Sequence, residues 1–312
     1  MAQPLSTHSA DYKKIWNFVH QTWGSIGKDG KGTPFFPGPQ PISIERRHMA
    51  QLRAKPYMVC EKTDGVRMAL VCIDGLCVFV NRSMVMTPVK LRVPQSAYKG
   101  TILDGEFTTT KSGKDHYMVY DTLMVNGASV KTEDLVTRLN TAEEMVKKIL
   151  KTVRDPFLVK MKTFNLMKRV GSVIEKITKS EYDYNTDGLI FTPINEPVRM
   201  GTHETLFKWK PLDHNTIDFL VKNRPDGCMG LYIQDRGELI FSGLIKRDQV
   251  SKEWHDALTD NCIAECQYQT NAWPKWWRPQ NIRTDKTHPN NRRTLNRTVV
   301  NIEEDIRIEE FV

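Results

Sequence analysis

The chain has 312 residues, and its 45 Lys and Arg against 37 Asp and Glu give a net charge of +8 at neutral pH. Hydrophobic residues at 39% and charged residues at 26% are typical of a globular protein and exclude a mainly disordered chain, a collagen or a coiled coil. The most apolar stretch, residues 68–80, is interrupted by Asp74 and is shorter than the roughly 20 residues that a membrane span needs. The N-terminal residues contain no apolar signal core, so we expect an intracellular protein, cytoplasmic or nuclear, without a membrane partner.

Apolar patterns predict the local elements up to residue 210. Helices are predicted in four segments, residues 10–23, 42–53, 133–153 and about 165–180. Short apolar runs bounded by Gly, Asp or Asn predict strands, at residues 57–62, 67–73, 76–80, 101–107, 116–125, 187–193 and 206–210. Because short turns separate many of these runs, we expect the strands to pair antiparallel.

After Asp213 the pattern changes to short strand-like pieces, at residues 217–221, 230–233, 238–243 and 262–268. Turn residues between them favour a small β-barrel. The following segment, residues 278–297, carries six Lys or Arg and one Asp, whereas residues 298–312 carry five acids and one Arg. The last segment fits either a helix or a strand. The chain as a whole predicts an α+β fold built on antiparallel sheets.

The sharpest chemical signal is EKTDGVR, residues 61–67, where Lys62 follows a predicted strand. A lysine amine can attack the α-phosphorus of a nucleoside triphosphate, form a phosphoramide and expel pyrophosphate. Gly65 would let the backbone pass close to such a nucleotide. The segment is therefore a candidate for covalent nucleotide transfer.

Further charged motifs follow this lysine in a fixed order. Arg82 ends a predicted strand, LDGEF contains Asp104 and Glu106, VYDTLMVNG contains Tyr120 and Asp121, TDGLIF contains Asp187, LFKWKP contains Lys208 and Lys210, and IRTDKTHPN contains Arg283, Asp285 and Lys286. Each motif is weak alone. So many in order around one lysine are not expected by chance.

This array resembles the covalent nucleotidyltransferases, which include polynucleotide ligases and mRNA capping guanylyltransferases. The segments PGPQPISIER, HNTIDFLV and NIEEDIRIEE are similar to the short monofunctional guanylyltransferases of large DNA viruses. The resemblance covers residues 40–312. It implies an antiparallel-sheet nucleotidyltransferase domain over residues 1–212, an OB-fold domain over 213–295, and a C-terminal segment, 296–312, that packs back on the first domain.

The resemblance also implies a role for each matching residue. Lys62 would be the nucleophile that accepts GMP from GTP, in the presence of Mg²⁺ or Mn²⁺. The roles implied around the nucleotide are Arg67 and Arg82 on the ribose side, Glu106 on a ribose hydroxyl or the metal, Tyr120 stacked on guanine, Lys162 at guanine O6, Asp187 on the metal, Lys208 and Lys210 on the α-phosphate, and Arg283, Asp285 and Lys286 on the β- and γ-phosphates.

Several residues also fit a purely structural role. Tyr120 fits a core aromatic residue on a strand. Asp104 fits a turn residue, and Asp121 fits a structural acid. Lys160 competes with Lys162 for the position at guanine O6. The sequence leaves these alternatives open.

The predicted reaction joins GMP from the lysyl-GMP intermediate to the 5′-diphosphate end of RNA. No segment matches an RNA triphosphatase tunnel or a Gly-rich S-adenosylmethionine turn, so we expect a separate triphosphatase and a separate cap methyltransferase as partners. Two alternatives remain. An ATP-dependent polynucleotide ligase would use the same lysine with another base and acceptor. A nucleic-acid-binding protein with an inactive transferase domain would form no covalent adduct.

Overall fold

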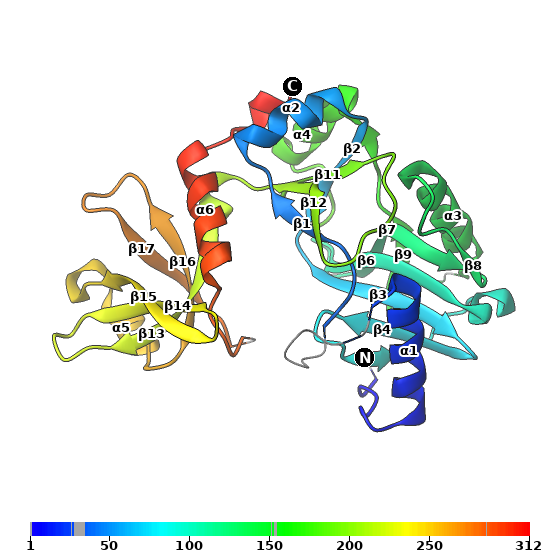
Figure 1. The fold of residues 1–312 in the computed structure, drawn as a ribbon, viewed down its shortest axis with the longest axis horizontal. Helices are drawn as coiled ribbons and strands as arrows, with labels where there is room; N and C mark the ends of the chain where they lie inside the picture. Colours follow the sequence, from blue (N-terminus) through cyan, green and yellow to red (C-terminus); the bar gives the residue numbers. More distant parts are fainter. Residues whose placement is uncertain (1, 26, 28–34, 151, 153–154, 285) are drawn as a thin grey trace. The chain divides into compact units, whose positions relative to one another are not determined.

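The computed structural model describes residues 2–25, 27, 35–150, 152, 155–284 and 286–312. They divide into two compact units, which are drawn together in Figure 1. Unit 1 consists of Met1–Ile42, Ala50–Trp209 and Phe311–Val312, and unit 2 consists of Ser43–Met49 and Lys210–Glu310. The short segment 43–49 thus belongs to the same unit as most of the last third of the chain.

The larger sheet of unit 1 contains seven strands in the described part of the chain. They are β3 (Val66–Ile73), β4 (Leu76–Asn81), β5 (Met86–Pro88), β6 (Thr101–Thr109), β7 (Asp115–Val125), β8 (Ala128–Ser129) and β9 (Phe157–Met161). Their order is β5-β4-β3-β6-β7-β8, and β9 pairs with β7 in parallel while the other pairs are antiparallel. The antiparallel pairing of the strands predicted at 67–73, 76–80, 101–107 and 116–125 is confirmed.

Two helices cover opposite faces of this sheet (Figure 1). Helix α1 (Ala10–Trp23) packs against the face that contains Val71. Helix α3 (Leu135–Lys148) packs against the face that contains Leu70. Because side chains alternate along a strand, the near-continuous apolar run of β3 supplies a core on both faces. The helix predicted at 10–23 is confirmed, and the helix predicted at 133–153 is confirmed over Leu135–Lys148. Leu150 instead forms a β-bridge with Arg92, and residues 151 and 153 lie outside the described residues.

The second sheet of unit 1 carries the candidate nucleophile. Its strands are β1 (Gln40–Ser43), β2 (Tyr57–Thr63), β10 (Asn165–Leu166), β11 (Thr186–Pro193) and β12 (Thr202–Trp209), in the order β1-β12-β11-β2-β10. A tight turn joins β2 to β3, so Lys62 ends one sheet while Arg67 begins the other. A Cβ on Gly65 in that turn would lie 2.5 Å from the carbonyl oxygen of Phe107. The close approach of strand β6 is therefore one reason for glycine at this position.

Two predicted helices differ from the structure at their N-terminal ends. The helix predicted at 42–53 is strand β1 followed by helix α2 (Arg46–Ala54). The helix predicted at about 165–180 begins only at α4 (Val170–Thr178), because Asn165 pairs with Val59 of β2. Short 3₁₀ helices occur as η1 (Gln95–Lys99), η2 (Met167–Arg169), η3 (Leu212–His214), η4 (Arg247–Gln249) and η5 (Ile308–Phe311). In both helical errors, pairing with a distant strand overrides the local pattern.

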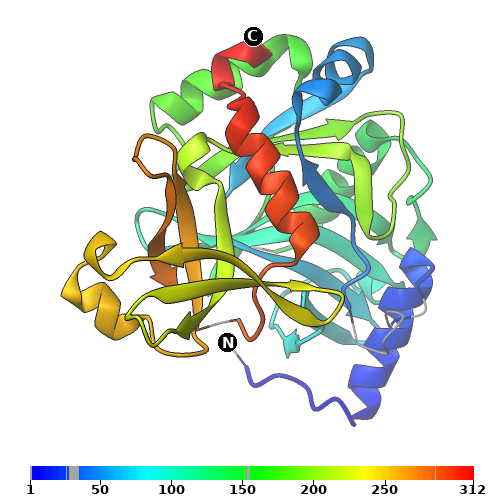
Figure 2. The same cartoon turned by 60° about the vertical axis from the view of Figure 1, so that its left-hand side comes forward.

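Unit 2 contains one antiparallel sheet among its described residues. Its strands are β13 (Thr216–Asn223), β14 (Met229–Asp235), β15 (Glu238–Ile245), β16 (Ile263–Gln269) and β17 (Trp276–Ile282), in the order β15-β14-β13-β16-β17. Its helices are α5 (Lys252–Ala257) and α6 (Arg292–Glu304). Figure 2 shows the yellow strands of this sheet crossing the orange ones, as expected of a strongly twisted sheet. Helix α6 packs Ile302 and Val299 into the core of this unit.

The edge strands of this sheet curl towards each other. A Cβ on Gly243 of β15 would lie 3.7 Å from the ring of Trp277 on β17. Backbone pairing in the described residues leaves β15 and β17 as the two edges, so the predicted OB-type barrel stays a prediction. The α+β class with antiparallel sheets is confirmed. In the parts of the chain that the structure describes, no helix is long and apolar enough to cross a membrane.

The C-terminal residues are divided between the two units, Glu310 in unit 2 and Phe311–Val312 in unit 1. In unit 2, Arg46 binds the carboxylate of Glu310 at 2.7 Å and the main-chain carbonyl of Glu304 at 2.9 Å. In unit 1, the ring of Phe311 lies 4.9 Å from the ring of Phe191 and 5.9 Å from that of Trp209. The last segment, which fitted either a helix or a strand, is helical at residues 292–304 and 308–311.

Candidate active site

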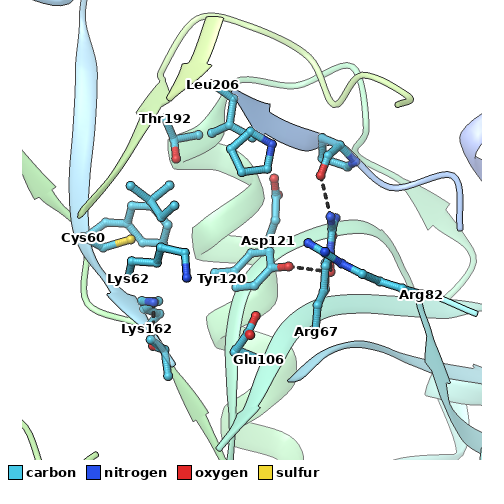
Figure 3. Close-up of a pocket in the computed structure, with 16 residues that line it drawn as sticks. Cys60, Lys62, Arg67, Arg82, Glu106, Tyr120, Asp121, Lys162, Thr192 and Leu206 are labelled. Atoms are coloured by element: carbon cyan, nitrogen blue, oxygen red, sulfur yellow. Dashed lines mark hydrogen bonds and ion pairs between the residues drawn. The ribbon is translucent and has the colours of Figure 1, made fainter. Parts of the chain in front are cut away.

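A pocket in unit 1 is lined by side chains from both of its sheets (Figure 3). Six of the predicted site residues line it, namely Lys62, Arg67, Arg82, Glu106, Tyr120 and Lys162. Apolar side chains such as Ile190 and Leu206 complete the opposite wall. Convergent charged groups beside an apolar wall are typical of a ligand pocket.

Lys62 makes an ion pair at this pocket. Its Nζ donates a hydrogen bond to Oδ1 of Asp187 at 2.7 Å. Strands β2 and β11 are neighbours, with Thr63 opposite Thr186, and this pairing brings the two residues together. The side chain of Lys62 keeps 23% exposure and that of Asp187 keeps 10%. The predicted nucleophile is thus accessible, and a predicted metal ligand holds it.

Arg67, Asp104 and Tyr120 form a buried cluster in the pocket wall. Asp104 is 1% exposed and accepts hydrogen bonds from Arg67 Nε at 3.1 Å and Nη2 at 2.6 Å. The hydroxyl of Tyr120 donates to the same carboxylate at 2.9 Å. Burial by itself lowers the pKa of Arg67, but Asp104, Tyr120 and Glu106 together outweigh burial and raise it, so the guanidinium stays charged. Asp104 lies inside strand β6, and the alternative of a turn residue was wrong.

Glu106 lies opposite Arg67 in the pairing of β3 with β6. Burial raises the pKa of its carboxyl group, while Lys162, Lys62 and Arg82 each act in the opposite direction. The carboxyl group therefore lies within the field of several pocket cations. Such a group can accept a hydrogen bond from a bound hydroxyl.

Lys162 and Lys160 have different surroundings. Lys162 is buried, and its Nζ donates to Oγ1 of Thr63 at 2.7 Å and lies 3.4 Å from Oε1 of Glu61. The side chain of Lys160 is 42% exposed and lies 3.9 Å from Asp183. Of the two competing lysines, only Lys162 lines the pocket.

Asp121 also lines the pocket, but its carboxylate is bound by Arg138, which is not among the described lining residues. Its two carboxylate oxygens accept from Arg138 of helix α3 at 2.8 and 3.0 Å. Burial raises the pKa of Asp121, and the charge of Arg138 acts against that effect. This bidentate pair supports the structural alternative for Asp121, because it ties helix α3 to strand β7.

The two lysines of LFKWKP lie at the end of strand β12. Lys208 pairs with Ile190 across the strands and shares a strand face with Leu206, and both of these apolar residues line the pocket. Lys210 follows the strand and belongs to unit 2. Neither lysine is among the described residues that line the pocket.

Arg283 and Lys286 lie in unit 2, where they share one carboxylate. Asp218 of β13 accepts from Arg283 Nη1 at 3.1 Å and from Lys286 Nζ. The side chain of Asp218 is 8% exposed. Asp285, the third predicted residue of this motif, lies outside the described residues. The structure therefore places the two cations together, held by a buried acid.

The comparisons with known proteins agree with this arrangement. The family described as mRNA capping enzyme, catalytic domain, matches residues 6–212, and the mRNA capping enzyme C-terminal domain matches residues 214–312. The chain belongs to the mRNA capping enzyme family. This assignment confirms the predicted family and enzyme class, an mRNA guanylyltransferase.

Two relatives illustrate the range of this family. The chain is 28% identical to mRNA-capping enzyme subunit alpha of Schizosaccharomyces pombe, over 91% of this chain and 80% of that protein. It is 30% identical to the mRNA-capping enzyme of Mus musculus, over 85% of this chain but only 46% of that protein. The chain thus spans less than half the length of the mouse capping enzyme. Because both relatives are eukaryotic, the narrower resemblance to the viral form stays a prediction.

A solved structure of mycobacterial DNA ligase D complexed with ATP and MES is also similar. It has a TM-score of 0.44 and 14% sequence identity, and the match covers 81% of this chain and 95% of that one.

The described residues contain no group of three or more His, Cys, Asp and Glu side chains placed to hold a metal ion. Two carboxylates remain as candidate ligands, that of Glu106, which lines the pocket, and that of Asp187, which binds Lys62. Mg²⁺ in nucleotide sites is commonly bound by one or two carboxylates, with phosphates and water as the other ligands. The residues present therefore fit a metal that arrives with a nucleotide rather than a metal in a closed protein cage.

Three acids that matter in this structure were not predicted site residues. Asp104 holds Arg67 and Tyr120, Asp218 holds Arg283 and Lys286, and Glu61 faces Lys162. The available sequence signal was an acid inside an apolar strand pattern, since a buried carboxylate needs a charged or hydrogen-bonding partner. That signal indicates that the acid has a partner, but it does not identify which residue the partner is.

Proposed function

We propose that this capping-family chain transfers GMP from GTP to Lys62 and then to the 5′-diphosphate end of RNA. The observation that carries the proposal is the position of Lys62, at the end of β2 in a pocket with Arg67, Glu106 and Lys162. A pocket of several cations suits a triphosphate, and an accessible lysine within it suits covalent transfer.

In the first step Nζ of Lys62 attacks the α-phosphorus, a nitrogen–phosphorus bond forms, and the bond to the bridging oxygen breaks with loss of pyrophosphate. The nitrogen loses one proton to solvent as this bond forms, and before the attack the ammonium of the ion pair must lose another proton to gain a lone pair. Oδ1 of Asp187 already accepts a hydrogen bond from this amine at 2.7 Å, so it is the group placed to receive the proton that the ammonium loses before the attack. In the second step a terminal phosphate oxygen of the RNA attacks the same phosphorus and releases the lysine.

Residues around Lys62 would bind the rest of the nucleotide. Arg67 and Arg82 would contact the ribose side with Glu106, Tyr120 would stack on guanine, and Lys162 would lie at guanine O6. Lys208 and Lys210 would bind the α-phosphate. The half-buried ring of Tyr120 is fixed by its bond to Asp104, which suits a platform for a base.

Glu106 and Asp187 would hold a divalent metal, Mg²⁺ or Mn²⁺, whose charge would offset that of the phosphates. Arg283, Asp285 and Lys286 would contact the β- and γ-phosphates from the second domain. The proposed domains are residues 1–212 and an OB-fold at 213–295, with 296–312 returning to the first.

The proposed partners are an RNA with a 5′-diphosphate end, a separate RNA triphosphatase and a separate cap methyltransferase. The proposed location is the cytoplasm or nucleus of a eukaryotic cell, where the chain could be encoded by a virus. These proposals rest on the resemblance to the short monofunctional guanylyltransferases.

A covalent-labelling experiment tests the proposed reaction. The protein is incubated with Mg²⁺ or Mn²⁺ and α-labelled GTP or ATP, denatured and separated on a gel, with Lys62→Ala and the exposed-lysine control Lys55→Ala in parallel. We expect acid-labile, alkali-stable label from GTP that is lost only in Lys62→Ala. Label from ATP alone would indicate a polynucleotide ligase. A folded protein without label from either nucleotide would contradict the enzymatic proposal.

A further inference from the structure

A buried network lies beside the strand that carries the nucleophile. The side chain of Glu61 is 0% exposed. Its Oε1 accepts a hydrogen bond from the hydroxyl of Tyr184 at 2.8 Å and lies 3.4 Å from Nζ of Lys162. Its second oxygen, Oε2, is buried without a hydrogen-bond partner among the described residues. Among the described residues, Lys162 is therefore the cation that is paired with this carboxylate.

Lys162 depends on its acidic neighbours. Its side chain is only 4% exposed, and a buried ammonium group requires a nearby negative charge. Burial by itself lowers the pKa of Lys162, but Cys60, Glu61 and Glu106 outweigh burial and raise it. Burial also raises the pKa of Cys60 to about 12, so this thiol is neutral at neutral pH. Glu61 and Glu106 are then the anions that keep Lys162 charged.

The hydrogen bonds of Lys162 fix the direction of its ammonium group. An ammonium has three N–H donors. One is given to Thr63 at 2.7 Å, and Glu61 lies within ion-pair distance of Nζ, at 3.4 Å. Since Lys162 lines the pocket, a donor is left for a ligand there. A carbonyl oxygen can accept this hydrogen bond, whereas an amino group at the same place presents a donor to a cation.

We propose that Glu61 and Tyr184 are positioning residues, which hold Lys162 so that its remaining donor selects the 6-oxo group of guanine over the 6-amino group of adenine. This inference rests on the proposed function and adds the source of its base specificity. Neither residue needs to touch the nucleotide. Both residues act through Lys162. Glu61 and Lys62 are adjacent on β2, so their side chains lie on opposite faces of the strand.

The experiment compares GTP with a nucleotide whose base lacks the 6-oxo group and the N1 proton that accompanies it. Rates of covalent labelling are measured with GTP and with 2-aminopurine riboside triphosphate, which lacks the 6-oxo group, for the unaltered protein, Glu61→Gln and Tyr184→Phe. The expected loss in kcat/KM for GTP in Glu61→Gln is about 10-fold or more, the size of a hydrogen bond to a charged group. The rate with the 2-aminopurine nucleotide is expected to change much less.

Tyr57→Phe is the matched control. Tyr57 is also buried in unit 1, and its hydroxyl donates to the carbonyl of Thr205 at 2.8 Å, away from the pocket. We expect it to leave the ratio of the two rates unchanged, whereas Tyr184→Phe lowers this ratio in the same direction as Glu61→Gln by a smaller factor.

Equal losses with both nucleotides would overturn the inference, because Glu61 would then act on the neighbouring Lys62. If circular dichroism shows that Glu61→Gln does not fold, Tyr184→Phe decides the question, and an unchanged ratio in that variant overturns the inference. If Glu61→Gln and Tyr184→Phe both form the covalent adduct with an unchanged preference for GTP, this inference is refuted but the proposed function is not. Failure of the unaltered protein to label with GTP would overturn the proposed function and this inference together.

Discussion

Lys62 and Asp187 are 125 residues apart in the chain, yet Nζ of one lies 2.7 Å from Oδ1 of the other. The antiparallel pairing of β2 with β11 produces this contact. The ion pair keeps the amine at the pocket, and it also places a proton acceptor beside the nitrogen that would attack. A single carboxylate therefore orients the candidate nucleophile and is placed to accept a proton from it.

Replacing this carboxylate tests its role. Asp187→Asn keeps the shape of the side chain but removes the proton acceptor and the charge. We expect the rate of lysyl-GMP formation to fall about 100-fold, the lower range for loss of a positioned acid or base. Quenched-flow labelling with GTP measures this rate. Asp213→Asn, at a carboxylate that is 70% exposed, is the control, and equal rates in the two variants would refute a specific role for Asp187.

The pair of Arg67 with Asp104 is expected to stabilise unit 1. Asp104→Ala leaves a buried guanidinium without its counter-charge, and such changes cost about 3–5 kcal/mol of unfolding free energy. Urea unfolding followed by fluorescence measures the loss. Asp74→Asn is the control, because Asp74 is 59% exposed in its pair with Lys14 and should change stability by less than about 0.5 kcal/mol. A similar loss in both variants would contradict the prediction.

The variant Tyr120→Phe tests the role of the Tyr120 hydroxyl separately from that of its ring. It removes the bond of 2.9 Å to Asp104 and keeps the aromatic surface. We expect a loss of about 1 kcal/mol in unfolding free energy, the usual value of one neutral hydrogen bond. If the ring stacks on guanine, KM for GTP should change far less than in Tyr120→Ala. Equal KM values in these two variants would show that Tyr120 is only a core residue.

The C-terminal residue pair offers a simple stability test. Phe311 is 7% exposed and packs against Phe191 and Trp209, so Phe311→Ala should cost about 3–5 kcal/mol as a buried aromatic truncation. Val312 is 84% exposed, and Val312→Ala should leave the unfolding midpoint unchanged. Differential scanning calorimetry compares the two variants. Coincident melting curves would show that the aromatic contact does not stabilise the protein.

The cations of unit 2 should affect only one of the two reaction steps. The β- and γ-phosphates are present during GMP transfer to Lys62 but leave as pyrophosphate, so Lys286→Ala should slow lysyl-GMP formation about 10-fold or more, as for loss of a charged hydrogen bond. Transfer of GMP from isolated lysyl-GMP to diphosphate-ended RNA should keep its rate. Arg278→Ala, at an exposed arginine of β17, is the control. Equal slowing of both steps would contradict the proposed contact.

Local sequence patterns predicted a large part of this fold. Helices α1 and α3 and strands β2, β3, β4, β6 and β7 lie where periodicity placed them, because apolar spacing and turn residues act over a few neighbouring positions. The spaced motifs also predicted six residues that line one pocket. These motifs pointed to a site because phosphate and base binding require charged and hydrogen-bonding groups of these types.

Two strands that sequence patterns missed are β17, which pairs with the preceding strand β16, and β9, which pairs with β7 across helix α3. Strand β17 contains Pro279 and several polar residues, and it is stable as an edge strand because a proline there removes no essential ladder bond. Strand β9 is short, and only its parallel pairing with β7 identifies it. No pattern within these segments indicates the strand that each one joins.

The sequence alone predicted the candidate nucleophile and the order of the motifs, and it predicted the family that the comparisons confirm. Tertiary structure decided which acid holds which cation: Asp187 with Lys62, Asp104 with Arg67, and Glu61 with Lys162. The physical reason is that burial makes an ion pair obligatory without determining its members. Strand register and sheet order bring those members together, and both depend on contacts between residues distant in the chain.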